Sequence, residues 1–155
     1  MQVWIQGICI VTFGLTLTAC QNMYQHTTYP TEAALVANSA QNGLSTEISL
    51  DYRQAFQNLR EAYNYCIAYT RDQDMVFSDN KFEPDFEMGT LFARTGKGAY
   101  LYKMSVEGLK NNQTRLTLFL PKEFVGAQAR FQQDIQRALG QDVKCNRQHT
   151  ASKIK

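Results

Sequence analysis

Residues 99–121, AYLYKMSVEGLKNNQTRLTLFLP, decide the fold, because they hold two runs of alternating apolar residues joined by a short polar turn. Alternation with a period of two is typical of β-strands that have one covered face. The turn, residues 107–113, contains the Gly and Asn that hairpins need for positive φ. Each run gives one apolar set, and the sets are Tyr100, Tyr102, Met104 and Val106, then Leu116, Leu118 and Leu120.

Two segments before this hairpin also predict strands. The first is YCIAYT, residues 65–70, and the second is FEMGTLFAR, residues 86–94. In the second segment one side carries Phe86, Met88, Thr90 and Phe92. The glycine-rich RTGKG at 94–98 suits a second hairpin turn. We therefore expect four antiparallel strands.

Helical periodicity flanks these strands on both sides. Residues 51–66 carry apolar side chains at the spacing of one helix face, with Asp51 as the N-cap and Gln54 placed to complete a capping box. A second amphipathic segment follows Pro121 and ends at Gly140, a favoured stop. The two apolar stripes are Tyr52, Ala55, Phe56, Leu59, Ala62, Tyr63 and Cys66, and Phe124, Ala127, Phe131, Ile135, Ala138 and Leu139.

The element order is therefore helix, four antiparallel strands, helix. Two helices with one apolar stripe each bury those stripes together with one sheet face only when both lie on the same side of the sheet. The prediction is an α+β two-layer sandwich over residues 49–147, followed by a disordered tail at 148–155. Residues 20–48 are rich in Gln, Asn, Thr, Ser and Ala, which predicts a flexible tether, with a short helix within TEAALVANSA at 31–40.

Residues 1–19 have no Asp, Glu, Lys or Arg, and their apolar run covers only 8–17. A membrane-spanning helix needs about 20 apolar residues, so this length suits the apolar region of a secretory signal peptide instead. The run ends in Leu17, Thr18, Ala19 and Cys20. These four residues resemble the lipobox of bacterial lipoproteins.

The resemblance implies cleavage before Cys20 and acylation of that cysteine. Two or three acyl chains together hold a protein at a membrane almost permanently. Gln21 stands where an Asp would signal retention in the inner membrane. The resemblance therefore implies a periplasmic protein that is held at the outer membrane through acyl chains on Cys20.

Four cysteines are present, and Cys9 would leave with the signal peptide while Cys20 carries lipid. Cys66 and Cys145 then remain in an oxidising compartment, which favours one disulfide between them. The alternative is two separate buried thiols. Two cysteines without nearby histidines do not complete a zinc site, so we expect no metal and no cofactor.

Catalytic constellations are not evident in the sequence. The two histidines, His26 and His149, fall in the tether and the tail. The acidic stretch at 72–87 lacks the spacing of a calcium loop and is interpreted as a solvated connection. The net charge of +2 is too balanced to favour nucleic acid. We expect no enzyme and assign no catalytic residue.

Two functions remain. The first is a noncatalytic binding or accessory subunit of an envelope assembly, with a protein partner that contacts exposed members of the set Tyr63, Tyr65, Tyr69 and Tyr100. The predicted element order and lipid anchor of this chain are similar to those of BamC, a lipoprotein subunit of the outer-membrane barrel assembly machine. The alternative is an inhibitor or immunity protein that inserts the segment 72–85, as a rigid loop, into a periplasmic hydrolase.

Overall fold

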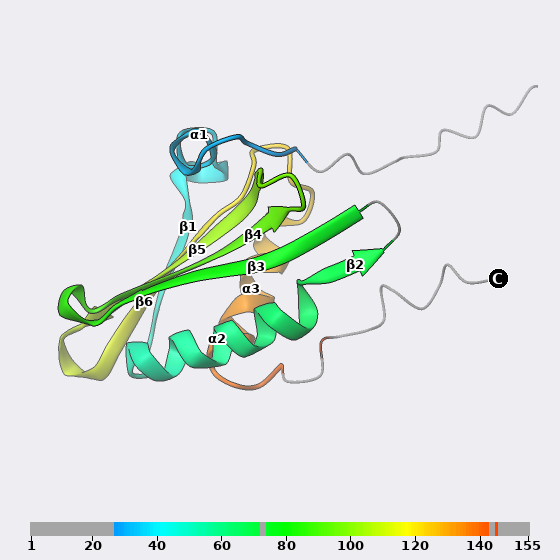
Figure 1. Cartoon of the computed structure of the whole chain (residues 1–155). Helices are drawn as coiled ribbons and strands as arrows, with labels where there is room; N and C mark the ends of the chain where they lie inside the picture. Colours follow the sequence, from blue (N-terminus) through cyan, green and yellow to red (C-terminus); the bar gives the residue numbers. More distant parts are fainter. Residues whose placement is uncertain (1–26, 72–73, 143–144, 146–155) are drawn as a thin grey trace, which may run out of the picture.

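The computed structural model describes residues 27–71, 74–142 and 145 (Figure 1). Its elements, in chain order, are α1 (Glu32–Ala37), η1 (Ala40–Asn42), β1 (Leu44–Ile48), α2 (Tyr52–Cys66), β2 (Tyr69–Arg71), β3 (Asp74–Glu83), η2 (Pro84–Phe86), β4 (Met88–Thr95), β5 (Tyr100–Leu109), η3 (Lys110–Asn112), β6 (Gln113–Phe119) and α3 (Ala127–Ala138). The fold is α+β, as the sequence predicted. No helix in these ranges is long and apolar enough to cross a membrane.

The sheet has six strands in the order β1-β6-β5-β4-β3-β2, and every neighbouring pair is antiparallel. The prediction of four strands is therefore wrong. One additional strand, β1, comes from the predicted tether and pairs with β6, with Leu44 opposite Leu118. The other, β3, lies within residues 72–87, for which the sequence predicts a solvated connection.

The predicted tether is wrong over its described part. Tyr29 exchanges two backbone hydrogen bonds with Tyr100, at 2.9 and 2.7 Å, and so adds to the end of β5. The short helix expected within 31–40 is present as α1, and its Leu35 is fully buried. The folded domain therefore includes residues from Tyr29 onward and is not limited to 49–147. The predicted signal peptide, Cys20 and the tail at 148–155 lie outside the described residues.

Helix α2 begins and α3 ends close to where the sequence indicates, but α3 begins at Ala127, so Phe124 of the predicted stripe precedes the helix. The Asp51 carboxylate accepts hydrogen bonds from the backbone N–H groups of Arg53 and Gln54, which caps α2. Gln54 does not complete a capping box, because its side-chain amide donates to Asn58 at 2.8 Å. Gly140 follows α3 with a φ of 73°, a left-handed conformation that suits glycine after a helix.

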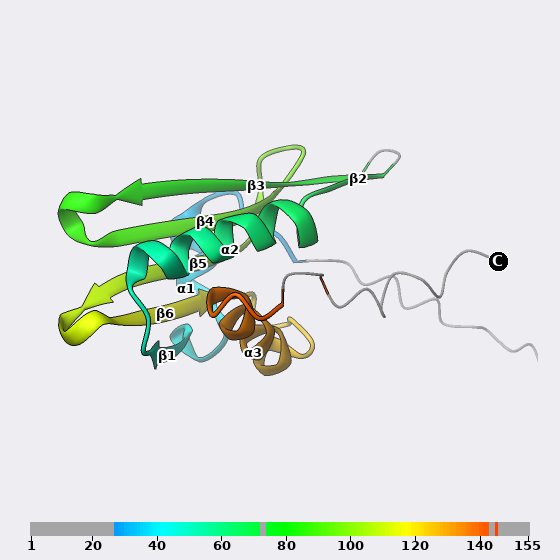
Figure 2. The ribbon, with the colours of Figure 1, turned by 90° about the horizontal axis from the view of Figure 1, so that it is seen from below.

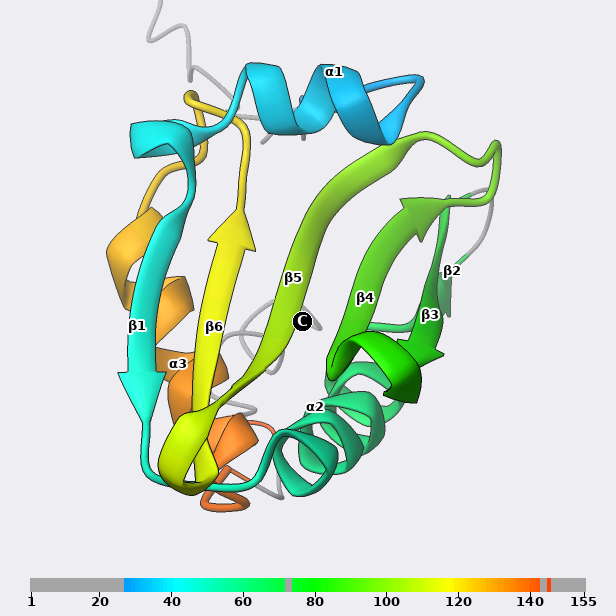
Figure 3. The ribbon, with the colours of Figure 1, turned by 90° about the vertical axis from the view of Figure 1, so that its left-hand side faces the viewer.

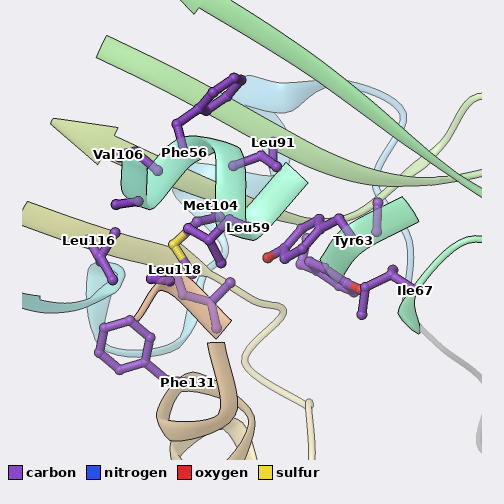
Figure 4. Packing of buried hydrophobic residues seen from close by; sticks show 14 of the residues in the cluster. Phe56, Leu59, Tyr63, Ile67, Leu91, Met104, Val106, Leu116, Leu118 and Phe131 are labelled. Carbon is purple, nitrogen blue, oxygen red and sulfur yellow. The ribbon is translucent and has the colours of Figure 1, made fainter. Parts of the chain in front are cut away.

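The sheet and the helices form two layers. Figures 2 and 3 show α2 and α3 side by side on one face of the sheet, while α1 lies across the end of β5 and β6. The main core lies between the layers and is shown in Figure 4. It includes Phe56, Leu59, Tyr63, Leu91, Met104, Val106, Leu116, Leu118 and Phe131.

The predicted apolar side of β4 is wrong. Leu91 and Ala93 are fully buried among the core residues, whereas Thr90 and Phe92 lie on the opposite face of the strand. The reason is Gly89, where an added Cβ would lie 2.4 Å from the Phe56 ring. The glycine lets α2 approach this face closely, so the side with the smaller residues is the covered one.

Candidate functional site

A cleft separates the end of α2 and the following β2 from α3. Its volume is about 1190 Å³, and it is open to solvent. A smaller hollow of about 260 Å³ shares Tyr65, Arg137 and Asp142 with it. The cleft is lined by Tyr65, Cys66, Ile67, Ala68 and Tyr69 on one side, and by Phe124, Val125, Gly126, Ala129, Arg130, Gln132, Gln133, Gln136, Arg137, Gln141, Asp142 and Cys145 on the other.

Large apolar side chains stand exposed at the rim of this cleft. Tyr65 is 80% exposed, Tyr69 is 48% exposed and Val125, in the loop before α3, is 76% exposed. They come from both walls: the two tyrosines belong to α2 and β2, and Val125 belongs to the α3 side. Exposed apolar groups that gather around one concave site are typical of protein interaction surfaces.

The floor beside α3 is a buried network centred on Asp134. The Asp134 carboxylate is fully buried; its Oδ2 accepts from the Tyr63 hydroxyl and from Arg130 Nε, both at 3.1 Å. Its Oδ1 accepts from the Arg137 guanidinium at 2.9 Å. Both oxygens are therefore satisfied, as a buried charge requires.

Two arginines extend this network toward the sheet and toward solvent. Arg130 donates to the Tyr102 hydroxyl of β5 at 3.1 Å, and its guanidinium lies 4.6 Å from the centre of the Tyr102 ring. Arg137 donates to Asp142 at 3.2 Å, beyond the end of α3. Arg130 and Arg137 thus balance Asp134 and Asp142, and the network joins α2, α3 and β5.

Burial and neighbouring charges shift the pKa values of Tyr63, Tyr102 and Arg130. Burial raises the pKa of the Tyr63 hydroxyl well above its usual value of 10.0, and the neighbouring Asp134 charge raises it further. Burial also raises the pKa of Tyr102, although Arg130 acts in the opposite direction. Burial alone would lower the pKa of Arg130, but Tyr102 and Asp134 raise it well above its usual value. The phenols stay neutral and the guanidinium stays charged.

Such a network is suited to holding elements together rather than to moving protons. A general base needs a pKa near the working pH and a free lone pair aimed at a substrate. The Asp134 oxygens instead accept from side chains of α2 and α3. Within the described residues, no group of three or more His, Cys, Asp or Glu side chains is placed to hold a metal ion.

The predicted disulfide partners meet at the edge of this cleft. Cys66 ends α2, and Cys145 lies at disulfide distance from it, with the two Cα atoms 5.3 Å apart. The return is short because α3 ends beside α2, where the Asn58 amide donates to the carbonyl of Ala138. That point is about two helical turns before Cys66.

The structure divides the other predicted contact residues. Tyr65 and Tyr69 are exposed at the cleft, whereas Tyr63 is fully buried and Tyr100 is half-buried on the opposite face of the sheet. Within the segment 72–85, Asp74–Glu83 forms β3 and not a rigid loop. The loop that the inhibitor alternative assumed is thus a strand over these residues. His26 and His149 lie outside the described residues.

Sequence reasoning missed the charged residues of the floor. Arg130, Asp134 and Arg137 follow one another at helical spacings of four and three, beside the apolar stripe of α3. This spacing is equally typical of a solvated helix face with ion pairs. The signal in the sequence is therefore present, but it does not show that α2 covers these charges.

Comparison with known proteins adds no family. No protein family model matches the chain, and no curated protein matches its sequence.

Proposed function

We propose that this protein is a lipoprotein, held through Cys20 at the periplasmic face of the outer membrane, that binds a protein partner in the cleft between α2 and α3. It acts as a noncatalytic accessory subunit of an envelope assembly. The complete lipobox at residues 17–20 supports the anchor. The cleft supports the binding role.

The observation that carries the binding role is the contrast between the rim and the floor of the cleft. The exposed rim residues Tyr65, Tyr69 and Val125 have apolar surface to bury, while the charges of the floor are engaged with each other. Exposed tyrosines supply much of the binding energy at protein interfaces, because they bury large apolar area and keep a hydrogen-bonding hydroxyl.

The lining also indicates the chemistry of the partner. Glutamines 132, 133, 136 and 141 line the α3 side, and the nearby charges balance. A strongly charged partner would find no excess of opposite charge here. The cleft suits a peptide segment that places an apolar side chain between Tyr65 and Val125 and forms hydrogen bonds with the glutamine amides.

The anchor would place this cleft near the membrane. Cys20 precedes Tyr29 by nine residues, which reach at most about 30 Å when fully extended. Tyr29 forms backbone hydrogen bonds with Tyr100, which lies beside the β4–β5 turn. In that turn the backbone N–H of Gly96 donates to the carbonyl of Met75, a β3 residue that is paired with β2 (Figure 1). Tyr29, where the chain from the anchor joins the domain, and β2, which lines the cleft, therefore lie at the same end of the sheet. We expect the partner to be a membrane protein or another membrane-anchored protein.

Site-specific photocrosslinking tests this proposal. A benzoyl-phenylalanine at position 65 is compared with one at Phe86, which is also exposed, at 72%, but lies in η2 away from the cleft. We expect a discrete crosslinked protein from position 65 and none of that mass from position 86. Equal or absent crosslinking at both positions contradicts the assignment of the cleft.

A further inference from the structure

The strand β3 has an unpaired edge. One of its edges pairs with β4 along Val76–Glu83, but the other pairs with β2 only at Asp74, Met75 and Val76. Within the described residues, no strand lies beside residues 77–83 on that side. An unpaired edge of this length presents backbone N–H and C=O groups that can accept another strand.

The alternation of the backbone identifies which groups face outward. In an antiparallel ladder, successive residues direct their N–H and C=O groups to opposite edges. The Asn80 N–H donates to the side chain of Asp79 at 2.8 Å and is therefore not part of the ladder with β4. Ser78 and Phe82 have the same parity as Asn80, so these three residues present their backbone groups to the open edge.

We propose that two copies of this chain pair through residues 77–83 of β3, antiparallel, with Asn80 opposite Asn80 on a twofold axis. The open stretch is bounded by β2 at Val76 and by Pro84 of η2, and Asn80 is its midpoint. Pairing about Asn80 therefore uses the whole stretch. The outward groups of the three residues would form about six hydrogen bonds between the copies.

The charges favour this register. With Asn80 at the centre, Asp79 of one copy lies opposite Lys81 of the other, and the contact occurs twice by symmetry. These are non-hydrogen-bonded positions, where opposing side chains are closest. The Asp79 and Lys81 side chains lie on the sheet face that carries Arg94, which is paired with Asp79 at 3.3 Å.

Neighbouring registers are unfavourable. If the same face of both sheets is to stay on one side, an alternative antiparallel register must place another whole residue, such as 79 or 81, on the twofold axis. A centre on residue 79 places two Asp79 carboxylates opposite each other, and a centre on residue 81 does the same for two Lys81 side chains. Like charges directly opposite one another destabilise a sheet. The sequence of the edge therefore specifies one register.

Pairing would also cover apolar surface. Phe82, on the helix side of the sheet, is 39% exposed although it stacks on Phe56 with ring centres 4.9 Å apart. In the proposed register it lies opposite Ser78 of the second copy. In the single chain, Asp79 satisfies the central Asn80 N–H and closes the edge. Lys81 pairs with Glu83 of its own chain at 2.8 Å, so dimer formation exchanges both contacts for the pairing between Asp79 and Lys81 of the two copies.

Cysteine crosslinking of full-length protein in detergent tests the proposal. Asn80→Cys places two thiols on the twofold axis, where Cα atoms of a hydrogen-bonded pair lie about 5.5 Å apart, within disulfide range. Copper-phenanthroline oxidation should give disulfide dimers at least tenfold more readily than Glu61→Cys, an exposed site on α2. The parent protein sets the background for the native cysteines.

Charge variants in the Asn80→Cys background separate this interface from random collision. Lys81→Glu should abolish the dimer, because it opposes Asp79 of the second copy, while Lys81→Arg should retain it. Lys110→Glu, an equal charge change at an exposed site in η3, should leave the dimer unchanged. The proposal is overturned by equal crosslinking of Asn80→Cys and Glu61→Cys, by a dimer that persists with Lys81→Glu, or by a crosslink to a different protein.

Discussion

Tyr63 and Asp134 are 71 residues apart in the sequence, yet the Tyr63 hydroxyl donates to the Asp134 carboxylate at 3.1 Å, and both side chains are fully buried. The contact joins α2 to α3 across the floor of the cleft. Arg130 and Arg137 of α3 bind the same carboxylate, so one buried charge holds both arginines and also anchors the Tyr63 hydroxyl of α2.

Removing the Asp134 charge should lower the stability of the fold substantially. Asp134→Ala leaves the Arg137 guanidinium, 4% exposed, without its buried partner. Breaking a buried ion pair from one side costs about 3–5 kcal/mol. Asp142→Ala is the control, because it removes the other carboxylate that binds Arg137 but is 18% exposed. Urea unfolding should show a clearly larger loss for Asp134→Ala; equal losses would show that the centre of the network carries no special weight.

Stability should fall in alkali because of Tyr63. Its pKa in the folded state lies above the usual 10.0, mainly through burial. The unfolded chain therefore releases this proton first, so stability is complete below about pH 10 and decreases as the pH rises further. Tyr63→Phe should lose about 1 kcal/mol at neutral pH and should flatten the alkaline decrease. Urea midpoints at pH 8 and at pH 10.5 measure both effects. If the midpoint of Tyr63→Phe falls between these pH values as much as that of the parent, Tyr63 is not the cause of the alkaline loss of stability.

The disulfide should stabilise the domain. Cys66 and Cys145 close a long loop, with a sequence separation of 79, and such bonds typically contribute about 2–4 kcal/mol. The Cys66→Ser, Cys145→Ser double variant should unfold at correspondingly lower urea concentration. Mass spectrometry of nonreduced, secreted protein decides the pairing directly, and two free thiols would show that the bond is not formed.

Gly89 should not tolerate a methyl group. A Cβ at this position would lie 2.4 Å from the Phe56 ring, which is held in the core, and overpacking of this kind costs about 1–3 kcal/mol. Gly96→Ala is the matched control, because its nearest neighbour is the end of the Met75 side chain at 3.2 Å, which can move. Thermal unfolding should separate the two variants, and equal shifts would mean that α2 can move away from β4.

Lipidation should depend on Cys20. Metabolic labelling with a palmitate analogue should mark the parent protein and not Cys20→Ala, and only the parent should fractionate with membranes. Density-gradient separation should place the labelled protein with outer-membrane markers, since Gln21 stands where an Asp would signal inner-membrane retention. Continued labelling of the variant would refute the lipobox assignment, and inner-membrane density would refute the location.

Local patterns in the sequence predicted the elements whose periodicity is strong. The apolar stripe of α2, its Asp51 cap, the apolar side of β6 and that of β5 from Tyr102 to Val106 follow from the fixed repeat of each backbone conformation. Tyr100 was expected on the same side of β5 but lies on the other face, because the β4–β5 register shifts at Ala93 and Arg94. Prediction was wrong for β3 and β1. In β3 the charges of Asp79, Lys81 and Glu83 indicated a loop, although charged side chains are common on edge strands.

The sequence by itself determined the α+β class, the two long amphipathic helices and the central hairpin, because these depend on neighbours within a few residues. Tertiary structure decided the order of the six strands, the covered side of β4 and the burial of Asp134. Each of these depends on a partner distant in the chain: Phe56 fills the space above Gly89, and Tyr63 and Arg137 enclose the Asp134 carboxylate. A residue's own identity does not specify which distant group will cover it, and packing alone resolves that choice.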